Sequence, residues 1–208
     1  SHRHDLYREV MEEFGTTEFV GYEVDSCEAR ILAIIPDDDG TFDLFLDRTP
    51  FYAESGGQVG DTGFIQAGSN RYEVIDTTFS LPGLRRHQCR VVAGILMVNQ
   101  DVSAGIDVSR RLAIRRHHTA THILHWALRQ VLGEHVKQAG SLVDDDRLRF
   151  DFSHYDAVTT EEIIRIETLA NAQVLANSNV IATESSKEEA LAAGAIAFFG
   201  DKYGDIVR

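Results

Sequence analysis

Hydrophobic positions change their period along the chain, from helical to strand-like to mixed. Between residues 5 and 14 the apolar residues follow a helical period, and Gly15 ends the segment. From Phe19 onwards the chain consists of short β-rich runs separated by turn residues, with no helical pattern between them. We expect strands at residues 19–24, 29–35, 42–46, 63–66, 72–77, 87–92 and 94–98. Closely spaced short strands of this kind are typical of a small antiparallel β-barrel.

After residue 107 the pattern alternates between helices and strands. We expect a helix that begins near residue 109 or 115 and ends at Gly133, then strands at 136–143, 148–152 and 180–184, and helices at about 159–177 and 186–193. The fold class predicted is α+β, with a small antiparallel β-barrel followed by a two-layer α/β domain. The expected parts are an opening helix at 1–18, a barrel domain with a glycine-rich loop at 19–108, and the α/β domain at 109–208.

Composition describes an ordinary globular chain, since 43% of its 208 residues are hydrophobic and 25% are charged. No apolar run has the length of a membrane span, and no signal-type segment opens the chain. The isolated Cys27 and Cys89 indicate free thiols in a reducing, cytosolic-type compartment, although a single disulfide remains open. We therefore expect a cytoplasmic protein with no membrane partner.

The formal net charge of −13 argues against a protein that coats nucleic acid by bulk electrostatics. Local charge is different, because arginine pairs at 110–111 and 115–116 lie near the start of the predicted helix. They form either a solvated face or a set of contacts to a few phosphates.

Histidines give that helix its candidate chemistry. His118, His122 and His125 fall within a narrow arc at about 100° per residue, whereas His117 lies at the edge of the apolar side and is expected to be packed. His118 and His122 are four residues apart, the spacing at which two imidazoles on adjacent turns reach one metal ion. The alternative is a solvated helix face. A zincin motif is excluded, because Thr119 stands where that motif has glutamate.

Within the β region, the segment from Thr49 to Gly63 reads TPFYAESGGQVGDTG and has four glycines among its last eight residues. Glycines permit positive φ and close backbone approach. The segment is either a bulged loop between strands or a loop whose backbone N–H groups line a binding pocket. It has neither the lysine of a P-loop nor the spacing of a dinucleotide-binding fingerprint.

Five segments, in this order, resemble motifs of the alanyl-tRNA synthetase family, in its β-barrel and editing region. They are TPFYAESGGQVGDTG at 49–63, HTATHILHWAL at 118–128, VKQAGS at 136–141, RFDFSH at 149–154 and FGDKYGDIVR at 199–208. The similarity extends over nearly the whole chain. It implies that residues 109–208 are an editing domain, which hydrolyses the ester of serine or glycine wrongly attached to tRNA(Ala). Such hydrolysis is needed because binding alone discriminates weakly between small amino acids.

The resemblance also implies a set of site residues. Zinc is expected on His118 and His122, with the family's remaining cysteine and histidine ligands beyond Arg208; Gln138 is the expected catalytic residue, and Gly56, Gly57 and Asp61 the expected substrate-binding residues. The partners implied are mischarged tRNA(Ala) and the rest of a synthetase chain, because the abrupt end at Arg208 favours a piece of a longer protein. A free-standing trans-editing deacylase and a non-catalytic tRNA-binding module are the alternatives.

Overall fold

The structure is a computed structural model that describes residues 2–195 and 204–208. The chain divides into two compact units, Ser1–Thr121 with Gly140–Phe150, and His122–Ala139 with Asp151–Arg208. Each unit is described by itself below. The three-part division expected from the sequence stays a prediction. The first half of the FGDKYGDIVR motif, residues 199–203, lies outside the described residues.

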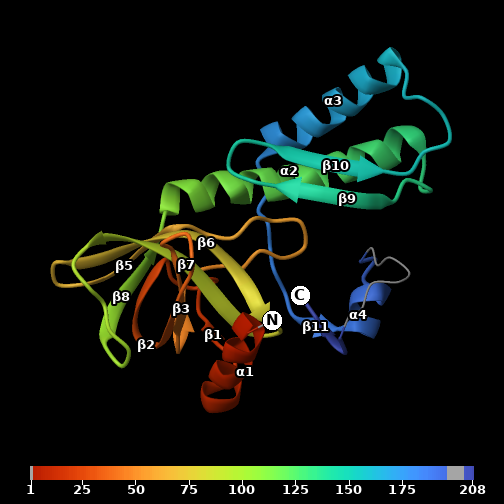
Figure 1. The fold of residues 1–208 in the computed structure, drawn as a ribbon. Coiled ribbons are helices and arrows are strands. Elements are labelled where there is room, and N and C mark those ends of the chain that lie inside the picture. Colours follow the sequence, from red (N-terminus) through yellow and green to blue (C-terminus); the bar gives the residue numbers. More distant parts are fainter. Residues whose placement is uncertain (1, 196–203) are drawn as a thin grey trace. The chain divides into compact units, whose positions relative to one another are not determined.

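A closed six-stranded barrel forms the body of the first unit (Figure 1). Its strands are antiparallel to their neighbours and follow the order β2 (Ser26–Pro36), β3 (Phe42–Leu46), β7 (Leu84–Ala93), β6 (Asn70–Leu81), β5 (Gly63–Ala67) and β8 (Asp101–Ile106). The predicted α+β class and the small antiparallel β-barrel are therefore confirmed.

Alternation of side chains fills the barrel. Along β8, Val102, Ala104 and Ile106 are buried while the residues between them are more exposed, as a strand with a period of two requires. Facing strands add further fully buried aliphatic side chains, including Ile31, Leu44, Ile65 and Val74. Burial of each large aliphatic side chain contributes roughly 1.5–3 kcal/mol, so this interior is a rigid support for the loops that leave it.

Two of the predicted strands are wrong in the barrel region. Residues 94–98 form a loop that turns back at Met97–Gln100, where Asn99 has a φ of 66°. Residues 19–24 contain only the end of β1 (Glu18–Phe19), which pairs with β4 (Arg48–Thr49) before the chain turns at 21–23. Strand β8 was not predicted, because serine, alanine and glycine weaken its apolar alternation.

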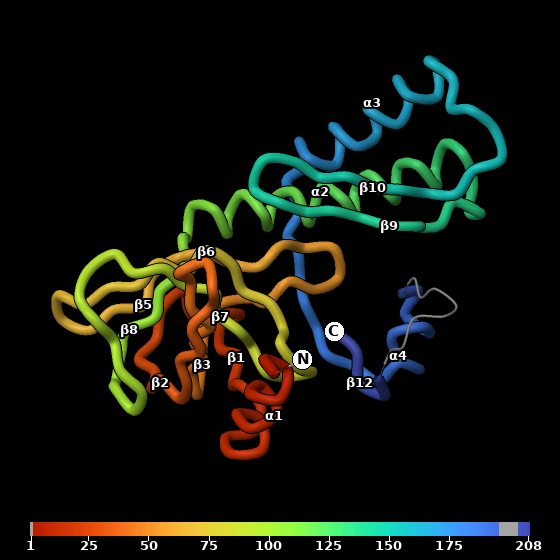
Figure 2. The backbone as a smooth tube through the Cα atoms, in the orientation of Figure 1, coloured from red at the N-terminus to blue at the C-terminus, as the bar shows by residue number. Residues whose placement is uncertain are grey.

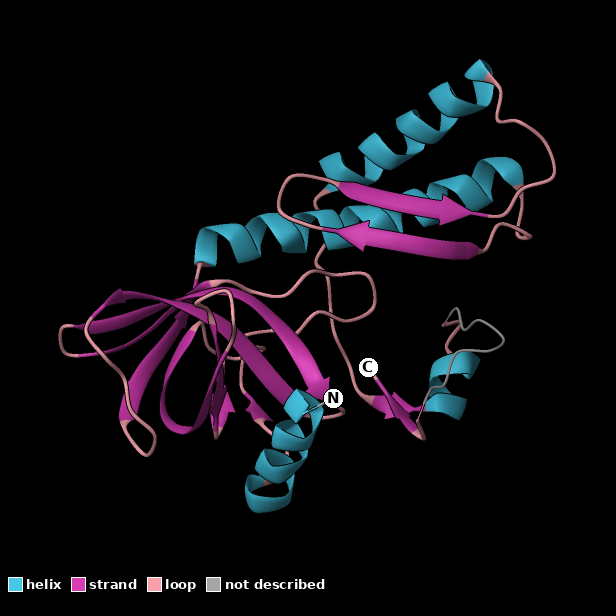
Figure 3. Ribbon diagram, viewed as in Figure 1, coloured by secondary structure: helices cyan, strands magenta, loops and turns pink. Residues whose placement is uncertain are grey.

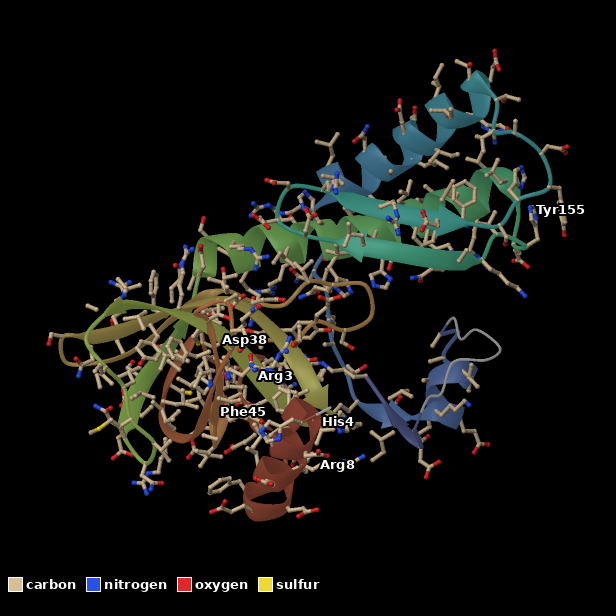
Figure 4. The ribbon with its side chains drawn as sticks, viewed as in Figure 1. Arg3, His4, Arg8, Asp38, Phe45 and Tyr155 are labelled. Atoms are coloured by element: carbon tan, nitrogen blue, oxygen red, sulfur yellow. The ribbon has the colours of Figure 1, made fainter. Side chains whose placement is uncertain are left out.

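Helix α1 (His2–Phe14) lies beside the barrel strands (Figure 2). A second apolar cluster packs the helix against them. Tyr7 and Val10 are buried there with Phe45 and others of the barrel. Arg3 Nη2 donates to Asp43 Oδ2 over 2.6 Å, and Tyr7 Oη donates to the same oxygen over 2.5 Å. Figure 4 labels Arg3 and Phe45 at this contact.

The longest helix, α2 (Val108–Leu132), confirms the predicted histidine helix and its end before Gly133. It runs unbroken through the boundary between the units at residues 121 and 122. A hairpin follows, formed by β9 (Gln138–Val143) and β10 (Leu148–Phe152), with Asp144 N donating to Arg147 O at the turn (Figure 3).

The two remaining helices begin where they are predicted, and a capping box begins each of them. Thr159 and Glu162 cap α3 (Thr160–Ala176), and Ser186 and Glu189 cap α4 (Lys187–Ala192). The strand expected at 180–184 is wrong, since pairing begins only at β11 (Ser185–Ser186), which is antiparallel to β12 (Ile206–Val207). In the described part of the chain, both cysteines are free and no helix is long and apolar enough to cross a membrane.

Burial of His87 inside the barrel generates a prediction about acid stability. Its Nδ1–H donates to Leu44 O over 2.9 Å, so Nε2 accepts from Thr49 Oγ1 over 2.8 Å, and the ring is fully buried and neutral. Desolvation lowers the pKa of His87 to about 4. Because the unfolded chain takes up this proton near its ordinary pKa of 6.5, stability present above pH 6.5 is lost as the pH falls toward 4, by roughly 3 kcal/mol.

Urea denaturation of the protein and of His87→Gln between pH 7.5 and pH 4.5 measures this loss. The stability difference between the two proteins is expected to shrink as the pH falls. A difference that stays constant over this range would show that His87 does not carry the proton-linked loss.

Candidate functional site

The glycine-rich loop is a tight hairpin. Gly56 and Gly57 have φ values of 60° and 83°, and the residues on either side exchange two hydrogen bonds, Ser55 N to Gln58 O (3.1 Å) and Gln58 N to Ser55 O (3.0 Å). Positive φ at both central residues defines a type I′ turn, which glycine pairs favour. The turn projects Gln58 from a fixed backbone position.

Backbone pairing attaches this turn to the β9–β10 hairpin within the first unit. Val143 N donates to Gly57 O over 2.8 Å, and Val59 N donates to Val143 O over 3.0 Å. A Cβ atom added to Gly57 would lie 2.6 Å from Ser141 O. Position 57 thus requires glycine for two reasons: its φ is positive, and Ser141 lies too close for a Cβ atom.

A buried ion pair fixes the base of the loop to the start of α2. Asp61 is 1% exposed; it accepts from Tyr52 N over 2.7 Å and from Arg111 Nε over 2.9 Å, and it also pairs with Arg111 Nη2. The remaining guanidinium donors of Arg111 reach the carbonyl oxygens of Gly21 and Pro50 at 2.9 and 3.0 Å. Each of the three guanidinium nitrogens has an acceptor in the loops beside the barrel, and this set of contacts fixes the start of α2 against them.

Gln58 meets the first histidine of the predicted pair. His118 Nδ1 lies 2.7 Å from Gln58 Oε1, and an amide oxygen only accepts, so Nδ1 carries the proton. The neutral ring then has its lone pair on Nε2. An outer hydrogen bond of this kind orients histidines that bind metals, because it fixes both the tautomer and the ring plane.

His117 and His125 on α2 differ in their burial and in their hydrogen-bond partners. His117 Nδ1 donates to Asp144 O over 2.7 Å, which agrees with its expected packed position. His125 is 8% exposed and its Nε2 lies 3.4 Å from Val136 O, while burial lowers the pKa of its ring. His125 therefore lies in the predicted arc but, unlike His118 and His122, is buried, because it continues the buried stripe formed by Thr121 and Leu128.

The structure brings together only part of the predicted site. Gly56, Gly57, Asp61 and His118 lie in the first unit, and His122 and Gln138 lie in the second, where both side chains are exposed. His118 and His122 share the exposed face of α2 at a spacing of four residues. Among the residues described, no group of three or more histidine, cysteine or acidic side chains is arranged to hold a metal ion.

Sequence reasoning missed Gln58 and Arg111. Gln58 stands between two glycines and a valine with no pattern of its own, and only the fold brings it to a histidine 60 residues away. Arg111 belongs to a pair interpreted as a solvated face or a phosphate contact, whereas it is 9% exposed and bound to Asp61. How deeply a helix residue is buried near the start of the helix depends on tertiary packing. The charge of Arg111 alone therefore indicated exposure where the fold buries it.

Comparison with known proteins decides the family. A family model described as tRNA synthetases class II (A) matches residues 2–110, just over half of the chain. The alanine–tRNA ligase of Acetivibrio thermocellus is 49% identical over 92% of the chain, and that of Pelotomaculum thermopropionicum is 45% identical over all of it. The ligase of Pseudomonas entomophila is 45% identical over 97%. This chain belongs to the alanine–tRNA ligase family.

Similarity to these ligases continues past residue 110, because they match 92–100% of the chain and so include the histidine helix and the hairpin. The chain spans about a quarter of the length of each relative, from 23% to 25%. Membership in the ligase family therefore refers to one region of such a protein.

The Asp61–Arg111 pair gives a stability prediction. Removing one partner of a buried ion pair leaves the other charge buried, which costs about 3–5 kcal/mol. We expect Asp61→Ala to lower the free energy of unfolding by that amount, measured by urea denaturation. Asp101→Ala is the matched control, since its pair with Arg30 is exposed and is expected to change stability by less than about 1 kcal/mol. Equal effects of the two substitutions would contradict the assigned role of Asp61.

Proposed function

We propose that this region hydrolyses the ester between tRNA(Ala) and wrongly attached serine or glycine, as the editing part of an alanine–tRNA ligase. The observation that carries the proposal is the Gln58–His118 hydrogen bond. It assigns the lone pair to His118 Nε2 on the exposed face of α2, one turn before His122. Histidines that bind metals usually donate the other ring N–H to an acceptor that fixes the ring, and Gln58 Oε1 supplies such an acceptor to His118.

Zinc fits these residues as half of a tetrahedral set. His118 and His122 would hold it, and the family resemblance implies a cysteine and a histidine beyond Arg208 for the other two positions. The described residues supply no third ligand of their own. When bound, zinc polarises an ester carbonyl and lowers the pKa of a water molecule.

The chain's own residues would orient the substrate. Gln138, exposed at the first position of β9, offers amide donors and an acceptor for the aminoacyl group. Gly56 is exposed at the tip of the turn and offers its backbone at close range, whereas the Gly57 carbonyl is already used by Val143. Asp61 acts in this proposal through Arg111, by holding the base of the loop.

In this proposal, exposed basic residues contact the tRNA itself. Arg115 and Arg116 are both exposed on the first half of α2, close in sequence to His118. Guanidinium groups contact phosphates well and fix the register of a nucleic acid without reading its bases. The free Cys27 and Cys89 suit a reducing compartment, and we propose that the reaction takes place in the cytoplasm.

Replacement of His122 by alanine tests the proposal in a full-length ligase that carries this region. Deacylation of Ser-tRNA(Ala) is expected to fall by more than about 100-fold, since loss of a ligand exceeds the 10–100-fold effect of losing an outer-shell partner. Zinc content should fall in parallel. His4→Ala, an exposed histidine on α1, is the control and should leave both quantities unchanged.

Unchanged deacylation and zinc content in His122→Ala would remove His122 from the site. Absence of both zinc and deacylation in the parent protein would favour a non-catalytic tRNA-binding module. Activity of the isolated region without the rest of the ligase would favour the free-standing deacylase.

A further inference from the structure

An exposed aromatic ring follows β10 in the second unit. Tyr155 is 82% exposed, and Figure 4 labels it on the segment between β10 and α3. One face of the ring stacks on His135, with ring centroids 4.6 Å apart and an interplanar angle of 23°. A large side chain that is both exposed and held by stacking has a defined orientation toward solvent.

His135 is itself held by a second imidazole. His135 Nε2 and His154 Nδ1 are 2.8 Å apart, a hydrogen bond that requires the rings to meet edge to edge. Their centroids are 5.0 Å apart and their planes differ by 20°, so the two imidazoles form one nearly flat surface. Backbone pairing of Ser153 N with Lys137 O at 3.0 Å joins the two segments that carry these rings.

We propose that Tyr155, supported by the His135–His154 pair, is a platform on which an unpaired nucleobase of RNA stacks. The base would cover the face of Tyr155 opposite His135. Aromatic side chains bind unpaired bases in this manner, and every base offers a flat face to such a ring. A ring already fixed by stacking loses little conformational freedom on binding. The inference rests on the proposed function only for the identity of the RNA as a tRNA.

Acidic residues slightly outnumber basic residues around the platform. Lys137 is exposed, and Arg129 Nη1 donates to Glu134 O over 2.8 Å beside His135. Glu134 and Asp156 are acidic and exposed, while Glu162 is engaged by the cap of α3 at Thr159. With no excess of positive charge, recognition at Tyr155 depends on stacking and contributes little to the salt dependence of RNA binding.

Binding of a short unpaired RNA tests the platform. The probe is a tetranucleotide with 2-aminopurine at its 3′ end, whose fluorescence is quenched when the base stacks. Tyr155→Ala is expected to weaken binding roughly 5- to 150-fold, the range for loss of one stacked base. Tyr155→Trp should keep the affinity and Tyr155→Leu should behave like alanine, because bulk without a π-face does not stack. The slope of affinity against salt concentration should not change in any of them.

Tyr22→Ala is the matched control, since Tyr22 is 63% exposed in the barrel unit and should have no effect. Parent-like binding by Tyr155→Ala, or full affinity in Tyr155→Leu, would overturn the platform, because neither alanine nor leucine offers a π-face to the base. His122→Ala keeps the two proposals apart, because it should abolish deacylation and leave tetranucleotide binding intact. If the parent protein deacylates Ser-tRNA(Ala) but Tyr155→Ala binds the tetranucleotide as the parent does, the platform is refuted and the proposed function stands.

Discussion

The pairing of Val143 with the Gly56–Gly57 turn is the constraint on which the site depends. Two backbone hydrogen bonds place the turn against β9, and this pairing tolerates no side chain at position 57. Once the turn is fixed, Gln58 is buried and its amide oxygen has one orientation that reaches His118. A loop of four glycines is therefore specified by its contacts rather than left flexible.

Rigid supports lie on both sides of that pairing. The barrel core holds the strands from which the loop leaves, and Arg111 connects the loop base to α2 through Asp61 and two carbonyl oxygens. Side chains placed by packed elements and outer hydrogen bonds keep the geometry that chemistry needs. Inside the barrel, the neutral and buried His87 is likewise held in one orientation, because each of its ring nitrogens has a hydrogen-bond partner.

Local signals in the sequence were sufficient for much of the fold. Capping boxes at Thr159 and Ser186 give the starts of α3 and α4, and Gly133 gives the end of α2, because these signals act within a few residues. The weak alternation of β8 concealed a strand whose pairing with β2 and β5 is set by barrel closure. Long-range contacts also explain why the contact of Gln58 and the burial of His125 were not predicted. Nothing near either residue in the sequence indicates its partner in another segment. The pair His118 and His122 was visible because both members belong to one helix.

The tautomer of His118 tests the central claim most directly. Nitrogen-15 chemical shifts of the imidazole, measured at alkaline pH in labelled protein and assigned with His118→Asn, distinguish the two neutral forms. The account predicts a proton on Nδ1 and a lone pair on Nε2, with a return to a mixture of tautomers in Gln58→Leu. A proton on Nε2 in the parent protein would contradict it, because Gln58 would then not be the group that orients this ring.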